Sequence, residues 1–471
     1  MDGTRIRSNL PGLFQKSFQI GLVKASEICF YCVFPKPRRP ENRFTLARTS
    51  PHRDLPKLLR GRGAVAAATL RSQLAISPAT LSREVRAASD RVLRLGAGPA
   101  THYGLAARHG GLPDRLPVFR IGPEGVVARV AELVPLDGGS WLESERGGGT
   151  PFEGLPPFIH DMAPAGYLGR RFTHHHPDLQ LPDRLQDWHD GHRLIAIARR
   201  GTDCPGDLVV GEEAMDLHFK QQYSEYSSAD FPALARCAGL GGAGSSAAGE
   251  QPKFASFDGE RHLLVKFTPG DGSPTDQRWR DLLVCEAIAS QCLREGGIAA
   301  TESSIVEEGE YRYLRVERFD RTRNGRIGVL SLGALDDEYF GQRDNWSSAA
   351  ERLYREGMLS TEDVRKVKLV ESFAMAIGNS DRHFGNLALY CDALNPRAGC
   401  ALAPVYDMVP MALAPSGGVL PPAAFPEPRR TARLLDVHDE AMVLAADFFA
   451  RLAADERISK ELRVAAEERP K

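Results

Sequence analysis

Apolar residues recur every three or four positions through several stretches of the chain, a spacing that predicts amphipathic helices. The clearest helix is expected at 361–378, followed by another long helical stretch at 433–468. The apolar face of the first consists of Val367, Val370, Phe373, Ala374 and Ile377. From about 115 to 230 the pattern instead favours short strands and turns. After 240 it favours strand, loop, strand and helix before a helical C-terminal half.

A second pattern lies near the N-terminal end, where apolar spacing is interrupted at Ile76 and Ser77. Ser77 can cap a new helix that has Pro78 in its first position, and two short strands around a Gly-Pro turn follow. This order predicts a winged helix-turn-helix within 51–112. The residues expected to face the DNA major groove are Thr80, Ser82, Arg83 and Arg86.

Charge strengthens that prediction. The whole chain has a net charge of −1, but residues 1–110 contain 19 Lys or Arg against 6 Asp or Glu and so carry +13. The remainder therefore carries −14, an asymmetry typical of a nucleic-acid-binding end joined to an acidic body. Residues 1–50 are expected to be a disordered or mistranslated extension, and no run of 18 uncharged apolar residues predicts a membrane span.

Two cysteine and histidine patterns favour no metal site. The eight cysteines are scattered, which predicts reduced thiols, and the single C-x-x-C at Cys29 and Cys32 lacks a second pair. His174, His175 and His176 are adjacent, so their side chains would diverge on any regular backbone. An exposed loop is expected there.

The loop that follows the helix at 361–378 carries the candidate chemistry. Asp381 and Asn386 lie five residues apart in this loop, and Asp407 follows two short apolar strands. Phosphoryl transfer needs a carboxylate to accept the proton of the attacking hydroxyl and oxygen ligands for magnesium. The three residues supply both, although each of them alone is equally typical of a helix cap or a surface position.

Upstream residues complete a nucleotide-binding pattern. A Gly-, Ala- and Ser-rich loop near 240–250 precedes an apolar strand with Lys266 at its centre, and a buried lysine needs an anionic partner. The next helix offers Asp281 or Glu286 to orient Lys266, and the two alternatives stay open. The connector at Glu317 to Phe319 could hold adenine through its backbone.

With its motifs SSAAGEQPKF, VERFDR, NSDRHFGN and PVYDM, the chain resembles the HipA family of toxin kinases from about 150 to 450. The resemblance implies an α+β, bilobal protein-kinase-like (HipA/PI3-4-kinase-like) fold that uses ATP and Mg²⁺. It divides the chain into an N-terminal subdomain at 113–235, a kinase N-lobe with the nucleotide loop at 236–320 and a helical C-lobe at 321–471. The fused DNA-binding domain at 51–112 departs from the family, whose members usually bind DNA through a separate antitoxin.

The same resemblance assigns roles to individual residues. It implies Asp381 as the catalytic base, Asn386 and Asp407 as the metal ligands, Lys266 as the phosphate-binding lysine and Ser246 as an inhibitory autophosphorylation site. The remaining residues that it implies for nucleotide binding are Ala248, Gly249, Glu250, Gln251, Pro252, Lys253, Glu317, Arg318, Phe319, His383 and Tyr406.

The function expected from these residues is that of a cytoplasmic serine/threonine kinase toxin, associated with the nucleoid when bound to DNA through 55–110. Its substrate would be a translation protein, with an aminoacyl-tRNA synthetase as the candidate, and an antitoxin or a second copy of the chain would be its partner. The alternative is a transcriptional regulator with a nucleotide-sensing, catalytically silent body. A magnesium nuclease would also use acidic residues, but it would leave the lysine strand without a purpose.

Overall fold

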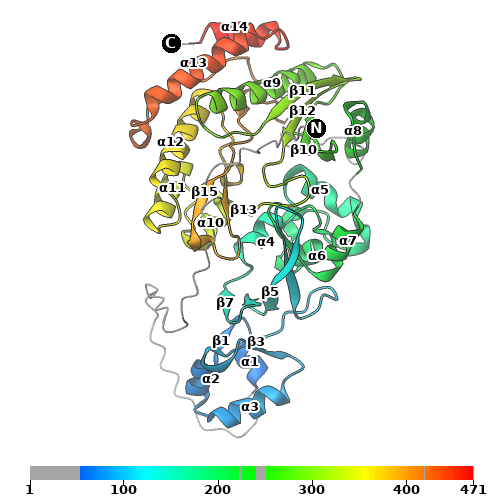
Figure 1. The fold of residues 1–471 in the computed structure, drawn as a ribbon, viewed down its shortest axis with the longest axis vertical. Coiled ribbons are helices and arrows are strands. Elements are labelled where there is room, and N and C mark those ends of the chain that lie inside the picture. Colours follow the sequence, from blue (N-terminus) through cyan, green and yellow to red (C-terminus); the bar gives the residue numbers. More distant parts are fainter. Residues whose placement is uncertain (1–53, 222–223, 240–250, 418, 470–471) are drawn as a thin grey trace, which may run out of the picture. The chain divides into compact units, whose positions relative to one another are not determined.

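The computed structural model describes residues 54–221, 224–239, 251–417 and 419–469, and Figure 1 shows its mixture of helices and antiparallel sheets. The expected α+β class is therefore confirmed. The extension expected at 1–50 lies outside the described residues, as do Cys29 and Cys32. Throughout the described part, no helix is both long enough and apolar enough to cross a bilayer.

The first described segment is a small unit of three helices and a sheet with strand order β1-β3-β2. Its elements are α1 (Leu55–Leu59), β1 (Val65–Ala66), α2 (Ala67–Leu74), α3 (Pro78–Ala87), β2 (Val92–Leu95) and β3 (His102–Leu105). Ser77 caps α3 as its sequence position predicts, because its hydroxyl accepts a hydrogen bond from the Thr80 N–H at 3.2 Å. Leu59, Leu70 and Leu81 form the core that holds α2 and α3 at a fixed angle.

A five-stranded antiparallel sheet with order β7-β6-β5-β4-β8 organises the middle of the chain. Its strands are β4 (Leu116–Ile121), β5 (Val127–Leu136), β6 (Gly139–Ser144), β7 (Gly149–Phe152) and β8 (Leu208–Val210). Between β7 and β8 lie α4 (Pro157–Met162), α5 (Gly166–His175) and α6 (Asp190–Arg200), and α7 (Glu212–Lys220) follows β8. The sequence pattern had favoured only strands and turns here, and α4 to α7 correct that expectation: the Gly and Pro residues at the helix ends are equally typical of turns between strands.

The three adjacent histidines correct a second expectation. His174 and His175 form the last turn of α5, and His176 is the C-cap residue, so the segment is mostly a helix end and not a loop. His174 and His175 are nevertheless exposed.

A four-stranded sheet, order β11-β12-β10-β9, carries Lys266. Its strands are β9 (Lys253–Phe257), β10 (His262–Phe267), β11 (Ser303–Glu308) and β12 (Tyr311–Glu317), with α8 (Phe231–Gly239) and α9 (Pro274–Glu295) packed against it. Val265 and Phe267 face the cluster that contains Phe231 of α8. Because side chains alternate along a strand, Lys266 faces the opposite side, where α9 lies.

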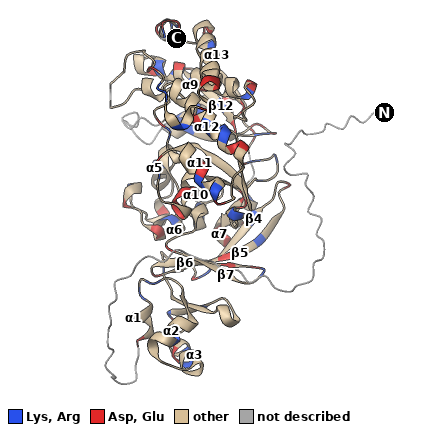
Figure 2. Ribbon diagram, turned by 90° about the vertical axis from the view of Figure 1, so that its left-hand side faces the viewer, with Lys and Arg blue, Asp and Glu red and all other residues tan. Residues whose placement is uncertain are grey.

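The C-terminal part is mainly helical, and Lys or Arg positions are interspersed with Asp or Glu positions along its helices (Figure 2). It contains α10 (Leu332–Tyr339), α11 (Trp346–Arg355), α12 (Thr361–Ala376), α13 (His438–Ala454) and α14 (Lys460–Glu467), with the small sheet β13 (Val329–Ser331), β14 (Ala388–Cys391) and β15 (Cys400–Leu402). Helix α12 packs between α11 and α13, and all five apolar positions expected on its buried face are buried. The prediction for this helix is confirmed.

Phe373 lies at the centre of this helical core, fully buried and edge-to-face with Phe448 at a centroid distance of 6.3 Å. Substitution Phe373→Ala should lower the free energy of unfolding by about 3–5 kcal/mol, because it removes the ring and leaves a cavity. The control is Val443→Ala on α13, where the side chain is 70% exposed and the expected change is within about 0.5 kcal/mol. Urea unfolding followed by circular dichroism measures both, and equal midpoints would show that α12 is not central to the core.

Candidate functional site

The loop after α12 begins where Gly378 adopts a positive φ of 80°, which turns the chain away from the helix axis. Asn379 is buried just beyond this turn. Its side-chain oxygen accepts a hydrogen bond from the Asp381 N–H at 2.9 Å, and its side-chain nitrogen donates to the Asp407 carbonyl at 3.3 Å. One buried amide therefore ties together the two segments that carry the candidate acids.

Asp381 and Asn386 lie within this loop with different exposure. The Asp381 side chain is 50% exposed, whereas Asn386 is buried and donates from its side-chain nitrogen to the Asp381 carbonyl at 2.9 Å. Because that nitrogen is engaged, the side-chain oxygen of Asn386 is the atom left to bind a cation. His383 lies with its Nε2 atom 4.0 Å from the Asp381 carboxylate. Hydrogen bonds therefore hold the Asp381 backbone on both sides while its carboxylate stays half exposed.

Lys266 lies between two carboxylates. Its Nζ atom donates to both oxygens of Glu286, at 2.6 and 2.7 Å, and also to Asp407. Burial opposes the lysine charge, but Asp407 and Glu286 together raise the pKa of Lys266 well above its usual range. The lysine is therefore a fixed positive charge at the junction of β10, α9 and the segment after β15.

The two acids of α9 now have distinct places. Glu286 pairs with Lys266, whereas Asp281 accepts a hydrogen bond from the Ser459 N–H at 2.9 Å and another from the Ser459 hydroxyl. Ser459 is the N-cap residue of α14, so Asp281 anchors that helix. The structure resolves the alternative that the sequence left open in favour of Glu286.

Asp407 has an unusual backbone, with a positive φ of 52° that non-glycine residues seldom adopt. Burial raises the pKa of its carboxyl, but Lys266 and Lys253 outweigh that effect and lower the pKa to about 2. The carboxylate is therefore charged at any physiological pH. One of its oxygens contacts Lys266 and the other is available to a cation.

Asn386 and Asp407 carry the kind of donor atom that a magnesium ion uses. Mg²⁺ prefers oxygen ligands, and in nucleotide sites it usually takes one or two protein side chains and completes its shell with phosphate oxygens and water. No cluster of three or more His, Cys, Asp or Glu side chains within the described ranges is arranged to hold a metal ion. An all-protein metal cage is therefore absent there, and a two-ligand site that needs a phosphate is the kind these residues can form.

The connector after β12 lies beside aromatic rings. The Phe319 ring is 5.5 Å from that of Tyr406, and the Tyr390 hydroxyl donates to the Phe319 carbonyl at 3.2 Å. Tyr406 in turn donates to the Gly385 carbonyl at 2.5 Å, which joins the connector to the loop of Asp381. The structure thus brings Phe319 and Tyr406 together, as the resemblance implied.

The side chain of Arg318 is held by acidic residues. Its guanidinium is engaged with Asp203 at 2.8 Å and with Asp320 at 2.9 Å. Because two carboxylates already hold the side chain, only the backbone of Arg318 is left for a ligand. Glu317 extends β12, where its N–H donates to the Glu302 carbonyl at 2.9 Å.

Only the end of the proposed nucleotide loop is described. Ser246, Ala248, Gly249 and Glu250 lie outside the described residues. Gln251 donates to the Phe267 carbonyl at 3.3 Å, and the Pro252 carbonyl accepts from the Phe267 N–H at 3.0 Å. Lys253 pairs in register with Lys266 and lowers the pKa of Asp407, so the strand that leaves the loop adds positive charge to the site.

The four residues expected to contact DNA are on α3 and not at this site. Ser82, Arg83 and Arg86 are exposed, whereas Thr80 is partly buried and its side chain contacts Ser77 and Arg83. Sequence reasoning also missed Asn379 as a site residue, although a polar residue directly after an apolar helix is a signal of a structured loop.

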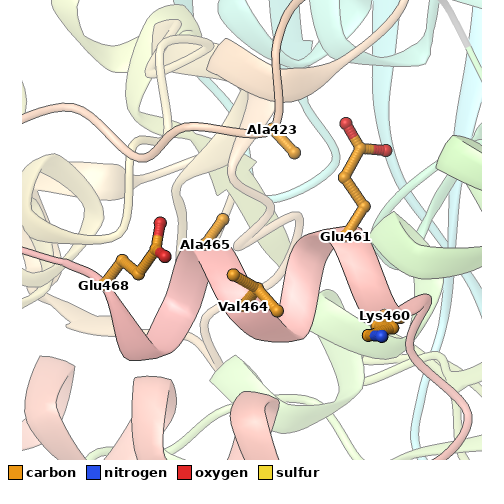
Figure 3. Close-up of a pocket in the computed structure, with 6 residues that line it drawn as sticks. All are labelled: Ala423, Lys460, Glu461, Val464, Ala465 and Glu468. Atoms are coloured by element: carbon orange, nitrogen blue, oxygen red, sulfur yellow. The ribbon is translucent and has the colours of Figure 1, made fainter.

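Two cavities lie elsewhere in the described part. One of about 500 Å³ runs along α14 and is lined by Ala423, Lys460, Glu461, Val464, Ala465 and Glu468 (Figure 3). The other, of about 310 Å³, is lined by Glu351, Tyr354, Arg355, Thr361 and Val364. Neither contains a residue of the candidate site, so the site is identified by its ion pairs and hydrogen bonds and not by cavity volume.

Comparisons with known proteins agree with the motifs. Residues 112–219 match the middle domain of YjjJ-like toxins, and residues 245–466 match the HipA-like C-terminal domain. Toxin YjjJ of Escherichia coli K12 is 35% identical over 428 residues, which cover 87% of this chain and 94% of that protein.

Two solved structures are more distant. The Shewanella oneidensis MR-1 HipA, solved with HipB and its operator DNA, has 13% identity and a TM-score of 0.48 over 75% of this chain and 94% of its own. The Helicobacter pylori proinflammatory kinase CtkA has 14% identity and a TM-score of 0.32 over 46% and 86%. The match to YjjJ is the one that decides the family, because it is both similar and nearly full-length. The resemblance to HipA is confirmed, and the chain belongs to the family of HipA-like toxins.

Proposed function

We propose that the chain is an ATP- and magnesium-dependent serine/threonine protein kinase with a bilobal kinase-like fold. The observation that carries this proposal is the buried contact of Lys266 with Glu286 and Asp407, which brings a phosphate-binding cation next to a metal-binding acid. A lysine, a helix glutamate and a metal-binding aspartate are the parts that kinases use to hold ATP phosphates. Asp381 and Asn386 add the other two parts on the adjacent loop.

Each residue has a chemical task in this proposal. Asp381 orients the substrate hydroxyl and accepts its proton, a task that suits its half-exposed carboxylate. Lys266 binds ATP phosphate oxygens, while Asn386 and Asp407 hold Mg²⁺, which neutralises phosphate charge when bound. Phe319 and Tyr406 provide aromatic surface for the adenine base. Glu286 keeps Lys266 in place.

The loop serine Ser246 and the substrate belong to the same proposal. A phosphate on Ser246 would add a charge of about −2 to a loop that has to receive ATP phosphates, so autophosphorylation would inhibit the enzyme. The substrate hydroxyl is proposed to be on a protein of translation, with an aminoacyl-tRNA synthetase as the candidate. An antitoxin or a second copy of the chain is the proposed regulatory partner.

DNA binding through the winged helix-turn-helix expected at 51–112 is a second, independent proposal. Ser82, Arg83 and Arg86 are exposed, and three- and four-residue spacing puts them on one face of α3, opposite the buried Leu81. Neither arginine forms an ion pair with another described residue, so both guanidinium groups are available to phosphates or base edges. The hairpin of β2 and β3 would act as the wing.

Substitution Asp381→Asn should reduce phosphoryl transfer by about 10²–10⁴-fold, because it removes the base while the loop hydrogen bonds of the backbone persist. Purified protein is incubated with Mg²⁺ and labelled ATP, and phosphate is located by mass spectrometry of residues 240–256. Phosphate on Ser246 is expected in the unsubstituted protein. The matched control is Asp439→Asn, whose side chain is 94% exposed.

Undiminished transfer by Asp381→Asn would refute the assignment of the base. Nucleotide binding without any transfer by the unsubstituted protein would instead favour the regulator with a silent kinase-like body.

Glu286 and Asp281 are both buried in α9, and substituting each of them separates a role at the proposed nucleotide site from a purely structural one. Glu286→Gln should weaken ATP binding and transfer because Lys266 loses one of its two charged partners. Asp281→Asn should instead lower the free energy of unfolding by about 1–3 kcal/mol and leave transfer per folded molecule unchanged. Thermal unfolding and transfer rates are measured on both variants. The assignment fails if the two variants lose transfer equally.

The DNA proposal predicts a change in the salt dependence of binding. The double substitution of Arg83 and Arg86 by Ala should weaken DNA binding and reduce the slope of log K against log salt by roughly two, about one for each phosphate contact. The control with the same charge change replaces Arg184 and Arg355, whose side chains are 74% and 69% exposed. Equal slopes for the two double variants, measured by fluorescence anisotropy on duplex DNA, would contradict the proposal.

A further inference from the structure

Two cysteines face each other across the hairpin that separates Asn386 from Asp407. Cys391 ends β14, Cys400 begins β15, and the two residues are direct partners in the antiparallel register. Both are free thiols and both are partly exposed. Among the other described cysteines, Cys285 and Cys292 are buried in α9, Cys204 is partly exposed and Cys237 is exposed.

The backbone hydrogen bonds show which kind of pair this is. The Cys391 N–H donates to the Gly328 carbonyl at 3.1 Å and the Cys400 N–H donates to the Met358 carbonyl at 2.7 Å. Both N–H groups therefore point away from the partner strand, as in a non-hydrogen-bonded pair. Such pairs have Cα atoms about 4.5 Å apart. This separation lies within the range of about 4.4–6.8 Å that a disulfide can span.

The two thiols also influence one another. The side chain of each acts on the other, which raises the pKa of the Cys391 thiol and lowers that of Cys400, and the Cys400 Sγ atom lies 3.4 Å from the Pro396 carbonyl. The direction of these pKa shifts favours Cys400 as the thiol that reacts first. Cys391 is placed to attack any oxidised form of its neighbour.

We propose that Cys391 and Cys400 are a redox modification site, which a hydroperoxide converts into a reversible disulfide. The Cys400 thiolate attacks one peroxide oxygen, the O–O bond breaks, and protonation of the leaving oxygen gives water or an alcohol and a sulfenic acid on Cys400. The Cys391 sulfur then attacks the Cys400 sulfur, and the S–O bond breaks with release of water. Two thiols are oxidised by two electrons, the peroxide is reduced by two, and a dithiol reductant reverses the change.

The position of this pair links it to the proposed nucleotide site. β14 begins directly after the loop of Asn386, and β15 leads into Tyr406 and Asp407. A Cα separation of about 4.5 Å is at the short end of the disulfide range, whose usual value is about 5.5–6 Å, so formation of the bond should spread the two strands. The disulfide should therefore shift Asn386 relative to Asp407 and weaken binding of magnesium-ATP. This consequence rests on the proposed kinase function, whereas formation of the disulfide does not.

Peptide mapping tests the disulfide directly. The full chain is treated with hydrogen peroxide, remaining thiols are alkylated, and trypsin cleaves after Arg397, between the two cysteines. A disulfide-linked peptide pair containing Cys391 and Cys400 is expected, and dithiothreitol should restore both thiols. If these two cysteines stay unpaired while other thiols oxidise, the proposal is wrong. The mapping uses unsubstituted protein. It distinguishes a Cys391–Cys400 disulfide from one between Cys29 and Cys32, because the two pairs lie in different tryptic peptides.

Nucleotide affinity tests the link to the site. Oxidation should weaken magnesium-ATP binding several-fold in the unsubstituted protein and in Cys237→Ser, an exposed control, but not in Cys391→Ser or Cys400→Ser. Equal weakening in all four proteins would overturn the link. Reduced protein that binds no nucleotide would instead refute the proposed kinase function, and peptide mapping would still decide the disulfide.

Discussion

A lysine ammonium buried between two carboxylates is the interaction on which the rest of the site depends. A charge without partners in the interior costs several kcal/mol, so Lys266 can stay buried only where α9 supplies Glu286 and the segment after β15 supplies Asp407. These three residues come from a sheet, a helix and a loop far apart in the sequence. Their ion pairs therefore fix how the four-stranded sheet sits against the helical part. They also hold Asp407 at a positive φ, a conformation that costs about 1–3 kcal/mol elsewhere.

Hydrogen bonds of two buried amides extend this constraint to the loop of Asp381. Asn379 bonds both the Asp381 N–H and the Asp407 carbonyl, and Asn386 bonds the Asp381 carbonyl. A shift of the Asp407 backbone would therefore move Asp381 as well, because the Asn379 side chain is hydrogen-bonded to both. The apolar face of α12 packs against α11 and α13, and this packing fixes the position at which the loop of Asp381 begins. The buried helix therefore ends at Gly378, and the hydrogen-bonded loop of the candidate site begins at Asn379.

The sequence was sufficient for the helix at 361–378, for the Ser77 cap and for the presence of Lys266 on a strand, because each has a local signal in periodicity or residue type. It could not choose between Asp281 and Glu286, since both lie on α9 and only the position of α14 shows that Asp281 is already used by Ser459. The sequence analysis also missed the helices α4 to α7, because the Gly and Pro residues at their ends are equally typical of turns between strands. It also could not show that Asp203 holds the Arg318 side chain, because the two residues are more than a hundred positions apart.

That last contact shows that the middle of the chain is part of the same structural unit as the candidate site. Asp203 lies in the segment that matches YjjJ-like toxins, whereas Arg318 and Arg321 lie in the segment that matches HipA. Both arginines contact the Asp203 carboxylate, at 2.8 and 3.0 Å, and Arg120 of β4 contacts Asp392 in the hairpin after β14. Without the middle segment, Arg318 and Arg321 would lose Asp203, and Asp320 would be the one of these two acids that still contacts them. Two arginine charges would then share one acid at the end of β12, where the connector to the proposed adenine site begins. The middle segment therefore contributes to the site electrostatically, although it supplies none of the residues proposed for catalysis.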